Sequence, residues 1–181
     1  VALISPVGLV SDTEYVSMTS LQHFIFSYLG HSPAAARTYF HSVRSMITWF
    51  PHSSDMLVTQ YATDTDRAIL DQCGLRHSLG MSMREGLNRS VEGAVQDLRL
   101  YCGPWDLALH KLQTPVSVWQ GSDDTIVPPD AAYRLADVLP NCRLEVIDDM
   151  GHYWLFGSFE RILDAIRIAP PRRNRASRTA Q

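Results

Sequence analysis

The order of strand-like and helix-like segments constrains the fold of this chain more than any other feature. Residues 1–4 form a short, continuous apolar run before Ser5-Pro6-Val7-Gly8, which predicts a strand buried on both faces and its exit turn. After about residue 103, short strand-like runs alternate with amphipathic helical repeats. This alternation predicts an α/β fold, in which helices cover both faces of a partial, mostly parallel sheet.

The predicted first strand also implies that the sheet has members beyond this chain. A strand buried on both faces needs a neighbour at each edge, and parallel strands pair only through crossover connections. Strands expected at residues 115–119 and 143–147 supply the neighbours on one side. We expect the others to lie upstream of Val1. Helices are expected at residues 129–139 and 155–168, and apolar residues mark one face of the second: Phe159, Ile162, Leu163 and Ile166.

Between these parts, from about residue 14 to residue 101, apolar residues recur at helical spacing. A first stripe, which Gly30 ends, contains Tyr15, Met18, Leu21, Phe24, Ile25, Tyr28 and Leu29. Ser32-Pro33 is a helix-start signal, and the helix it begins should run to Pro51. Further helices are expected at residues 54–61, 64–73 and 90–101, and no helix is assigned to residues 74–89.

These assignments predict one domain with a helical insertion. Residues 1–12 are a core strand and exit loop, residues 13–102 an inserted helical cap, and residues 103–168 the rest of the core. Residues 169–181 are expected to be a disordered basic tail, because they lack apolar periodicity and contain two prolines and four arginines: Arg172, Arg173, Arg175 and Arg178.

Composition and charge exclude several function classes. The formal net charge of -3 leaves no excess of basic residues to neutralise nucleic-acid phosphates. Cys73, Cys102 and Cys142 form no CxxC pair, the histidines show no H-x-x-x-H spacing, and no metal site is predicted. No apolar run approaches the roughly 20 residues that span a bilayer. We expect a cytoplasmic protein that acts on a small molecule, without a metal or an organic cofactor.

Two polar residues follow predicted strands and are the candidates for chemistry. Asp124 lies in the segment Trp119-Gln120-Gly121-Ser122-Asp123-Asp124-Thr125-Ile126-Val127-Pro128, and His152 follows Met150-Gly151. The carboxyl ends of parallel strands meet at one edge of a sheet, where ligands bind in α/β proteins. We therefore expect a carboxylate and an imidazole on the same side. Asp123 is the competing candidate for the acid, and a turn or helix-capping role is the alternative for both aspartates.

These segments resemble the α/β-hydrolase family. Its acid loop commonly reads G-x-x-D-x-x-V-P, which Gly121, Asp124, Val127 and Pro128 match, and its catalytic histidine commonly follows a glycine, as in Gly151-His152. The resemblance covers the chain to about residue 168, and the opening residues 3–6 look like the sixth strand of that fold. It implies that His152 is the general base and that Asp124 orients it.

The same resemblance implies an incomplete catalytic triad. The chain contains no G-x-S-x-G and no Gly-x-Asp or Gly-x-Cys elbow before a helix, so the nucleophile and the oxyanion donors are expected upstream. The implied activity is hydrolysis of a small apolar or ester-like substrate, in the manner of an esterase or a related enzyme. The alternatives are a non-catalytic relative that binds or regulates, and an inactive truncated product. The sequence identifies neither the residues that bind substrate nor the oligomeric state.

Overall fold

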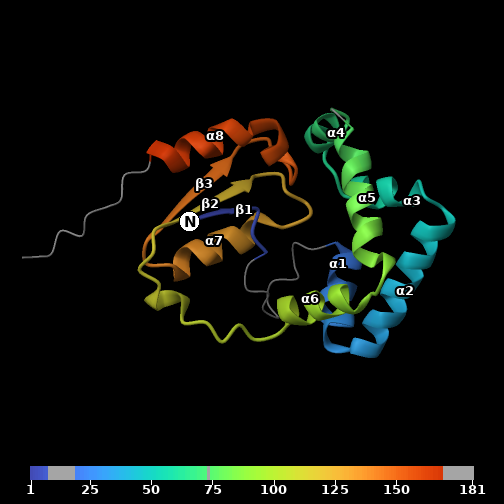
Figure 1. Cartoon of the computed structure of the whole chain (residues 1–181). Helices are drawn as coiled ribbons and strands as arrows, with labels where there is room; N and C mark the ends of the chain where they lie inside the picture. Colours follow the sequence, from blue (N-terminus) through green and yellow to red (C-terminus); the bar gives the residue numbers. More distant parts are fainter. Residues whose placement is uncertain (8–18, 73, 169–181) are drawn as a thin grey trace, which may run out of the picture.

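The computed structural model describes residues 1–7, 19–72 and 74–168, and it shows a small sheet with two covering helices beside a layer of helices (Figure 1). The layer, called the helical layer below, comprises α1 to α6. In chain order the elements are β1 (Ala2–Ile4), α1 (Ser20–Ser27), the 3-10 helix η2 (Leu29–His31), α2 (Pro33–Trp49), α3 (Ser53–Thr59), α4 (Asp64–Leu70), α5 (Leu75–Asn88), α6 (Glu92–Cys102), η3 (Leu109–Lys111), β2 (Val116–Gly121), α7 (Pro129–Val138), β3 (Cys142–Ile147) and α8 (Trp154–Ile168).

The sheet is parallel, as predicted. Its strand order is β1-β2-β3, with Ile4 beside Trp119 and Gly121 beside Ile147. The carboxyl ends of β2 and β3 therefore lie at one edge. Among the described residues β1 pairs with β2 alone, and all three of its residues are half-buried. The burial of residues 1–4 on both faces depends on the neighbours expected upstream of Val1, and it stays a prediction.

Helices cover both faces of the sheet, which confirms the predicted α/β architecture. Val116 and Val118 of β2 pack on one face against the buried residues of α7, Ala132 and Leu135. Trp119 points to the other face, where it joins a cluster completed by Ile147, Trp154 and Ile162. Figure 1 shows α7 and α8 on opposite sides of the strands. The alternation of side chains along β2 thus produces two separate core clusters.

The first two helices of the helical layer begin where their capping residues are. The Ser32 hydroxyl accepts a hydrogen bond from the Ala35 N–H, and Pro33 is the first residue of α2, as the sequence predicts. Thr19 and Gln22 form a capping box at the start of α1. The sequence predicted one helix that continues to Gly30. In the structure α1 ends at Ser27, and the 3-10 helix η2 begins at Leu29.

The other predicted helices of this part are confirmed, but α5 was missed. The helices expected at residues 54–61, 64–73 and 90–101 correspond to α3, α4 and α6. The sequence of α5 is rich in polar residues and contains two glycines. They weaken the apolar periodicity of the segment, although four apolar residues lie on one face of the helix: Leu75, Leu79, Met83 and Leu87. These four side chains pack on buried residues of α2, α3 and α4. Tertiary packing thus outweighs the weak helical propensity of this segment.

Some predictions concern residues outside those that the structure describes. They are Gly8, Tyr15, Met18 and Cys73, and the basic tail at residues 169–181. Among the described helices, none has the length and apolar character needed to cross a bilayer.

Two glycines of α5 differ in their surroundings and allow a matched test of the packing. A Cβ at Gly86 would meet no atom within 4 Å, whereas a Cβ at Gly80 would overlap the Asp55 carboxylate and approach the buried Ser54 hydroxyl to 3.0 Å. Gly86→Ala should raise the free energy of unfolding by about 0.5–1 kcal/mol, the usual gain of alanine over glycine in a helix. Gly80→Ala should not raise the free energy of unfolding, because the added Cβ overlaps the Asp55 carboxylate. Urea unfolding of both variants checks the prediction, and equal stabilisation would contradict it.

Candidate active site

The candidate site lies where the loops that follow β2 and β3 meet. The Ser122 N–H donates to the Ile147 carbonyl (3.0 Å), and the Asp123 N–H donates to the Met150 carbonyl (2.9 Å). A Cβ at Gly121 would overlap the carbonyl oxygens of Met150 and Gly151. The two loops can therefore approach this closely only because residue 121 has no side chain. We call residues 122–128 the acid loop and residues 148–153 the histidine loop.

Asp124 is a buried carboxylate whose two oxygens each accept two hydrogen bonds. Only 3% of the residue is exposed. Its Oδ1 accepts from the N–H groups of Ile126 (2.9 Å) and Val127 (2.8 Å). Its Oδ2 accepts from the side-chain amide of Gln120 (2.8 Å) and lies 2.9 Å from His152 Nδ1. This set of donors compensates the cost of removing a negative charge from water and fixes the direction of each oxygen.

The structure pairs His152 with Asp124 rather than with the competing Asp123. Asp123 is exposed and accepts a hydrogen bond from the Ser122 hydroxyl. The His152 side chain is about a quarter exposed (25%), while that of Asp124 is fully covered (0%). With Nδ1 directed at the carboxylate, the other ring nitrogen, Nε2, is the one that can exchange a proton with a reacting group.

Gln120 is a site residue that the sequence analysis did not single out. It is fully buried in β2, and its amide nitrogen donates to Asp124 Oδ2 and to the Val127 carbonyl (3.1 Å). It thus holds the acid loop at both its carboxylate and its backbone. A glutamine next to Val118 and Trp119 in a largely apolar strand was the available signal, because a buried amide needs polar partners.

Asp66 is a second residue that the sequence analysis did not connect with the site. It is the third residue of α4, where it forms a capping box with Thr63, and it is fully buried. The N–H of His152 donates to Asp66 Oδ2 (3.0 Å) and the N–H of Tyr153 to Asp66 Oδ1 (2.7 Å). The pattern Thr63-x-x-Asp66 signals a helix start, and nothing in it indicates a contact with the histidine loop.

The helical layer also contacts the acid loop. The side-chain amide of Gln22, in α1, donates to the carbonyl oxygens of Thr125 (3.2 Å) and Ile126 (2.9 Å). The hydroxyl of Thr125 donates to the carbonyl of Tyr61, between α3 and α4. Both loops of the candidate site are therefore held from the sheet and from the helical layer.

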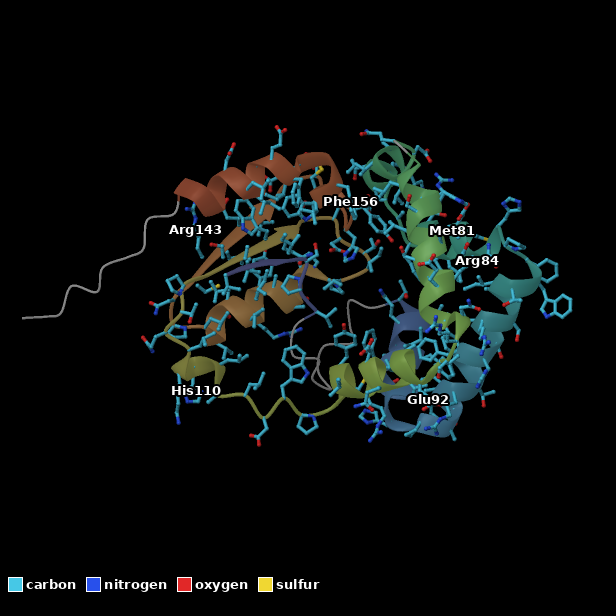
Figure 2. All side chains as sticks on the ribbon, in the orientation of Figure 1. Met81, Arg84, Glu92, His110, Arg143 and Phe156 are labelled. Atoms are coloured by element: carbon cyan, nitrogen blue, oxygen red, sulfur yellow. The ribbon has the colours of Figure 1, made fainter. Side chains whose placement is uncertain are left out.

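A cavity of about 320 Å³ lies elsewhere, between α2 and α5. Figure 2 shows two of its residues, Met81 and Arg84, among the helices of the layer and apart from the sheet. Neither Asp124 nor His152 lines it. Among the residues with described positions, no group of three or more His, Cys, Asp or Glu side chains is arranged to hold a metal ion.

Tyr153, next to the candidate histidine, is half-buried and has a raised pKa. Burial is the main cause, and the nearby carboxylates of Asp66 and Asp124 add to it, so that the pKa is about 12. The phenol donates to the Val58 carbonyl (3.1 Å) and packs edge-on against the His152 ring. Tyr153 is thus neutral at physiological pH and links the histidine loop to α3.

The raised pKa predicts a dependence of stability on alkaline pH. Because the pKa of Tyr153 is higher in the folded protein than the usual value of 10, its contribution is complete below about pH 10 and is lost as the pH rises towards 12. Burial also raises the pKa of Tyr39, so Tyr153 must be isolated by difference. Subtracting the ultraviolet titration of Tyr153→Phe from that of the wild type should leave one phenolate that forms near pH 12. A difference step near pH 10 would contradict the prediction.

Comparison with known proteins identifies the fold. A model of the α/β-hydrolase fold matches residues 75–158. Similar solved structures include a thermophilic esterase from Thermogutta terrifontis, with 18% identity, a TM-score of 0.57 and coverage of 92% of this chain and 53% of that one. A bromoperoxidase from Bacillus anthracis has 15% identity and a TM-score of 0.57, with coverages of 92% and 56%. An esterase from Exiguobacterium antarcticum has 17% identity and a TM-score of 0.53, with coverages of 92% and 55%.

No curated protein matches the sequence. The chain spans slightly more than half the length of the three solved structures, and at these identities the likeness is one of fold. The parallel sheet with helices on both faces, the family model and the solved structures agree with one another. The chain therefore has the α/β-hydrolase fold.

Proposed function

We propose that the chain carries the acid and the histidine of a hydrolase that acts on small apolar or ester-like substrates. The observation that supports this most directly is the contact of 2.9 Å between the buried Asp124 carboxylate and His152 Nδ1. A histidine held in this way presents Nε2 to a nucleophile, which is the arrangement that general-base catalysis needs.

In the proposed reaction His152 transfers a proton twice. Nε2 accepts the proton of the nucleophile as that group attacks the substrate carbonyl carbon, and the imidazole becomes a cation. Nε2 then gives the proton to the leaving oxygen as the bond from that oxygen to the carbonyl carbon breaks. A water molecule, activated in the same way, hydrolyses the acyl intermediate. Asp124 holds the proton on Nδ1 and stabilises the cation throughout.

The nucleophile and the oxyanion donors belong to residues upstream of Val1 in this proposal. The sequence contains no nucleophile elbow, and in this fold the chain order is nucleophile, acid, histidine. Residues 13–102, inserted between β1 and the core that contains the acid loop, then serve as a cap that excludes water and shapes the substrate pocket. Two of the solved structures with this fold are esterases, which supports testing esters first.

The proposal predicts a large loss of activity when the acid is neutralised. Asp124→Asn keeps the size of the side chain but disturbs the choice of ring nitrogen that carries the proton, and such a change costs about 10⁴-fold in kcat. The measurement is hydrolysis of p-nitrophenyl esters of two to eight acyl carbons by the gene product that contains this chain. His152→Ala should lose at least as much.

Asp123→Asn provides the matched control. It removes the same charge one residue earlier, at an exposed position without contact to His152. Its kcat should stay within about twofold of the wild type, since an exposed charge at this site contributes little. Equal losses in the Asp123 and Asp124 variants, or unchanged activity in Asp124→Asn, would refute the assignment of the acid. Absence of any ester hydrolysis by the wild type would refute the substrate class.

A further inference from the structure

Asp66 places a buried negative charge of the helical layer directly against the histidine loop. Its carboxylate accepts from three backbone N–H groups, those of Thr63 (3.3 Å), His152 (3.0 Å) and Tyr153 (2.7 Å). None of the residue is exposed. A buried carboxylate costs several kcal/mol unless donors surround it. The two shorter of these bonds come from the histidine loop, so that loop supplies much of the compensation.

Helix capping does not account for this geometry. In a capping box the side chain at the third position of the helix reaches back to the backbone of the capping residue, and for Asp66 this is the longest of the three bonds. Asp64 is in the same first turn of α4 and is exposed, so it can favour the helix terminus without contact to the histidine loop. The orientation of Asp66 towards residues 152 and 153 needs another explanation.

Gly151 is fitted to the same contact. A Cβ at this position would overlap both oxygens of the Asp66 carboxylate. The absence of a side chain at Gly151 therefore leaves space for the Asp66 carboxylate, which belongs to α4. The backbone of the histidine loop is then held between Asp66 on one side and, through the His152 side chain, Asp124 on the other.

We propose that Asp66 is a positioning residue for His152. It fixes the peptide N–H groups of residues 152 and 153, and thereby the direction in which the imidazole leaves the backbone and meets Asp124. This inference rests on the proposed function, because it assigns to the helical layer a part in aligning the general base. Packing of α4 against α8 keeps Asp66 in place. A displacement of about 1 Å in a catalytic group can cost about 10²-fold in rate.

Removing the charge of Asp66 should disturb His152 without unfolding the protein. In Asp66→Asn one amide oxygen can still accept, but the amide nitrogen then faces a backbone N–H, so one of the two bonds to the histidine loop is lost. We expect kcat for ester hydrolysis to fall about 10²-fold with KM changed less than threefold. In Asp66→Ala, which removes both hydrogen bonds to the histidine loop, kcat should fall further. Asp64→Asn is the matched control and should keep wild-type kcat.

A spectroscopic measurement separates positioning from a general loss of structure. The ¹⁵N chemical shifts of the His152 ring show which ring nitrogen carries the proton. The wild type and Asp64→Asn should show a single form with the proton on Nδ1, and Asp66→Asn a mixture of both forms. If Asp66→Asn retains both the single form and wild-type kcat, the inference is wrong.

Two further results keep this inference distinct from the proposed function. Wild-type amide protons of His152 and Tyr153 should exchange slowly with deuterated water, and rapid exchange would overturn the contact with Asp66 even if no Asp66 variant folds. If the wild type hydrolyses no ester, or if Asp124→Asn leaves activity unchanged, the proposed function fails. The ring-nitrogen measurement then still decides whether Asp66 positions His152.

Discussion

The buried carboxylate of Asp124 is the constraint on which the arrangement of the site depends. An ionised side chain with 3% exposure is tolerated only if donors surround it, and here they come from the acid loop itself, from β2 and from the histidine loop. The sheet must therefore place the ends of β2 and β3 next to each other. The direct pairing of Gly121 with Ile147 achieves this.

Close approach of the two loops follows from the parallel pairing but needs glycine. At Gly121 and at Gly151 a side chain would occupy space already taken, by backbone carbonyls in the first case and by the Asp66 carboxylate in the second. The motif residues around Asp124 and His152 thus serve two purposes. Asp124 and His152 form the polar contact of the candidate site, and the glycines allow three segments from distant parts of the sequence to meet.

The core of the fold and the main pair of the site could be predicted from the sequence. Alternating short apolar runs and amphipathic repeats predicted β2, α7, β3 and α8 to within two residues at each end, because the core clusters on the two faces of the sheet impose that periodicity. Asp124 and His152 could be located because each follows a strand. The helix α5 could not, since its apolar stripe is interrupted by glycines and its stability comes from contacts with α2, α3 and α4.

The contacts of Asp66 could not be predicted for a more general reason. Its partners are peptide N–H groups, which every residue except proline provides. The residue types at positions 152 and 153 therefore do not indicate the contact. The contact depends on residue type at only two positions. Residue 66 must carry the carboxylate, and residue 151 must be glycine because the carboxylate occupies the space of a Cβ there. A bond of this kind becomes visible only when the path of the backbone is known. Contacts between a side chain and the backbone of a distant loop must therefore be sought in the structure, first among the buried carboxylates of the neighbouring layer.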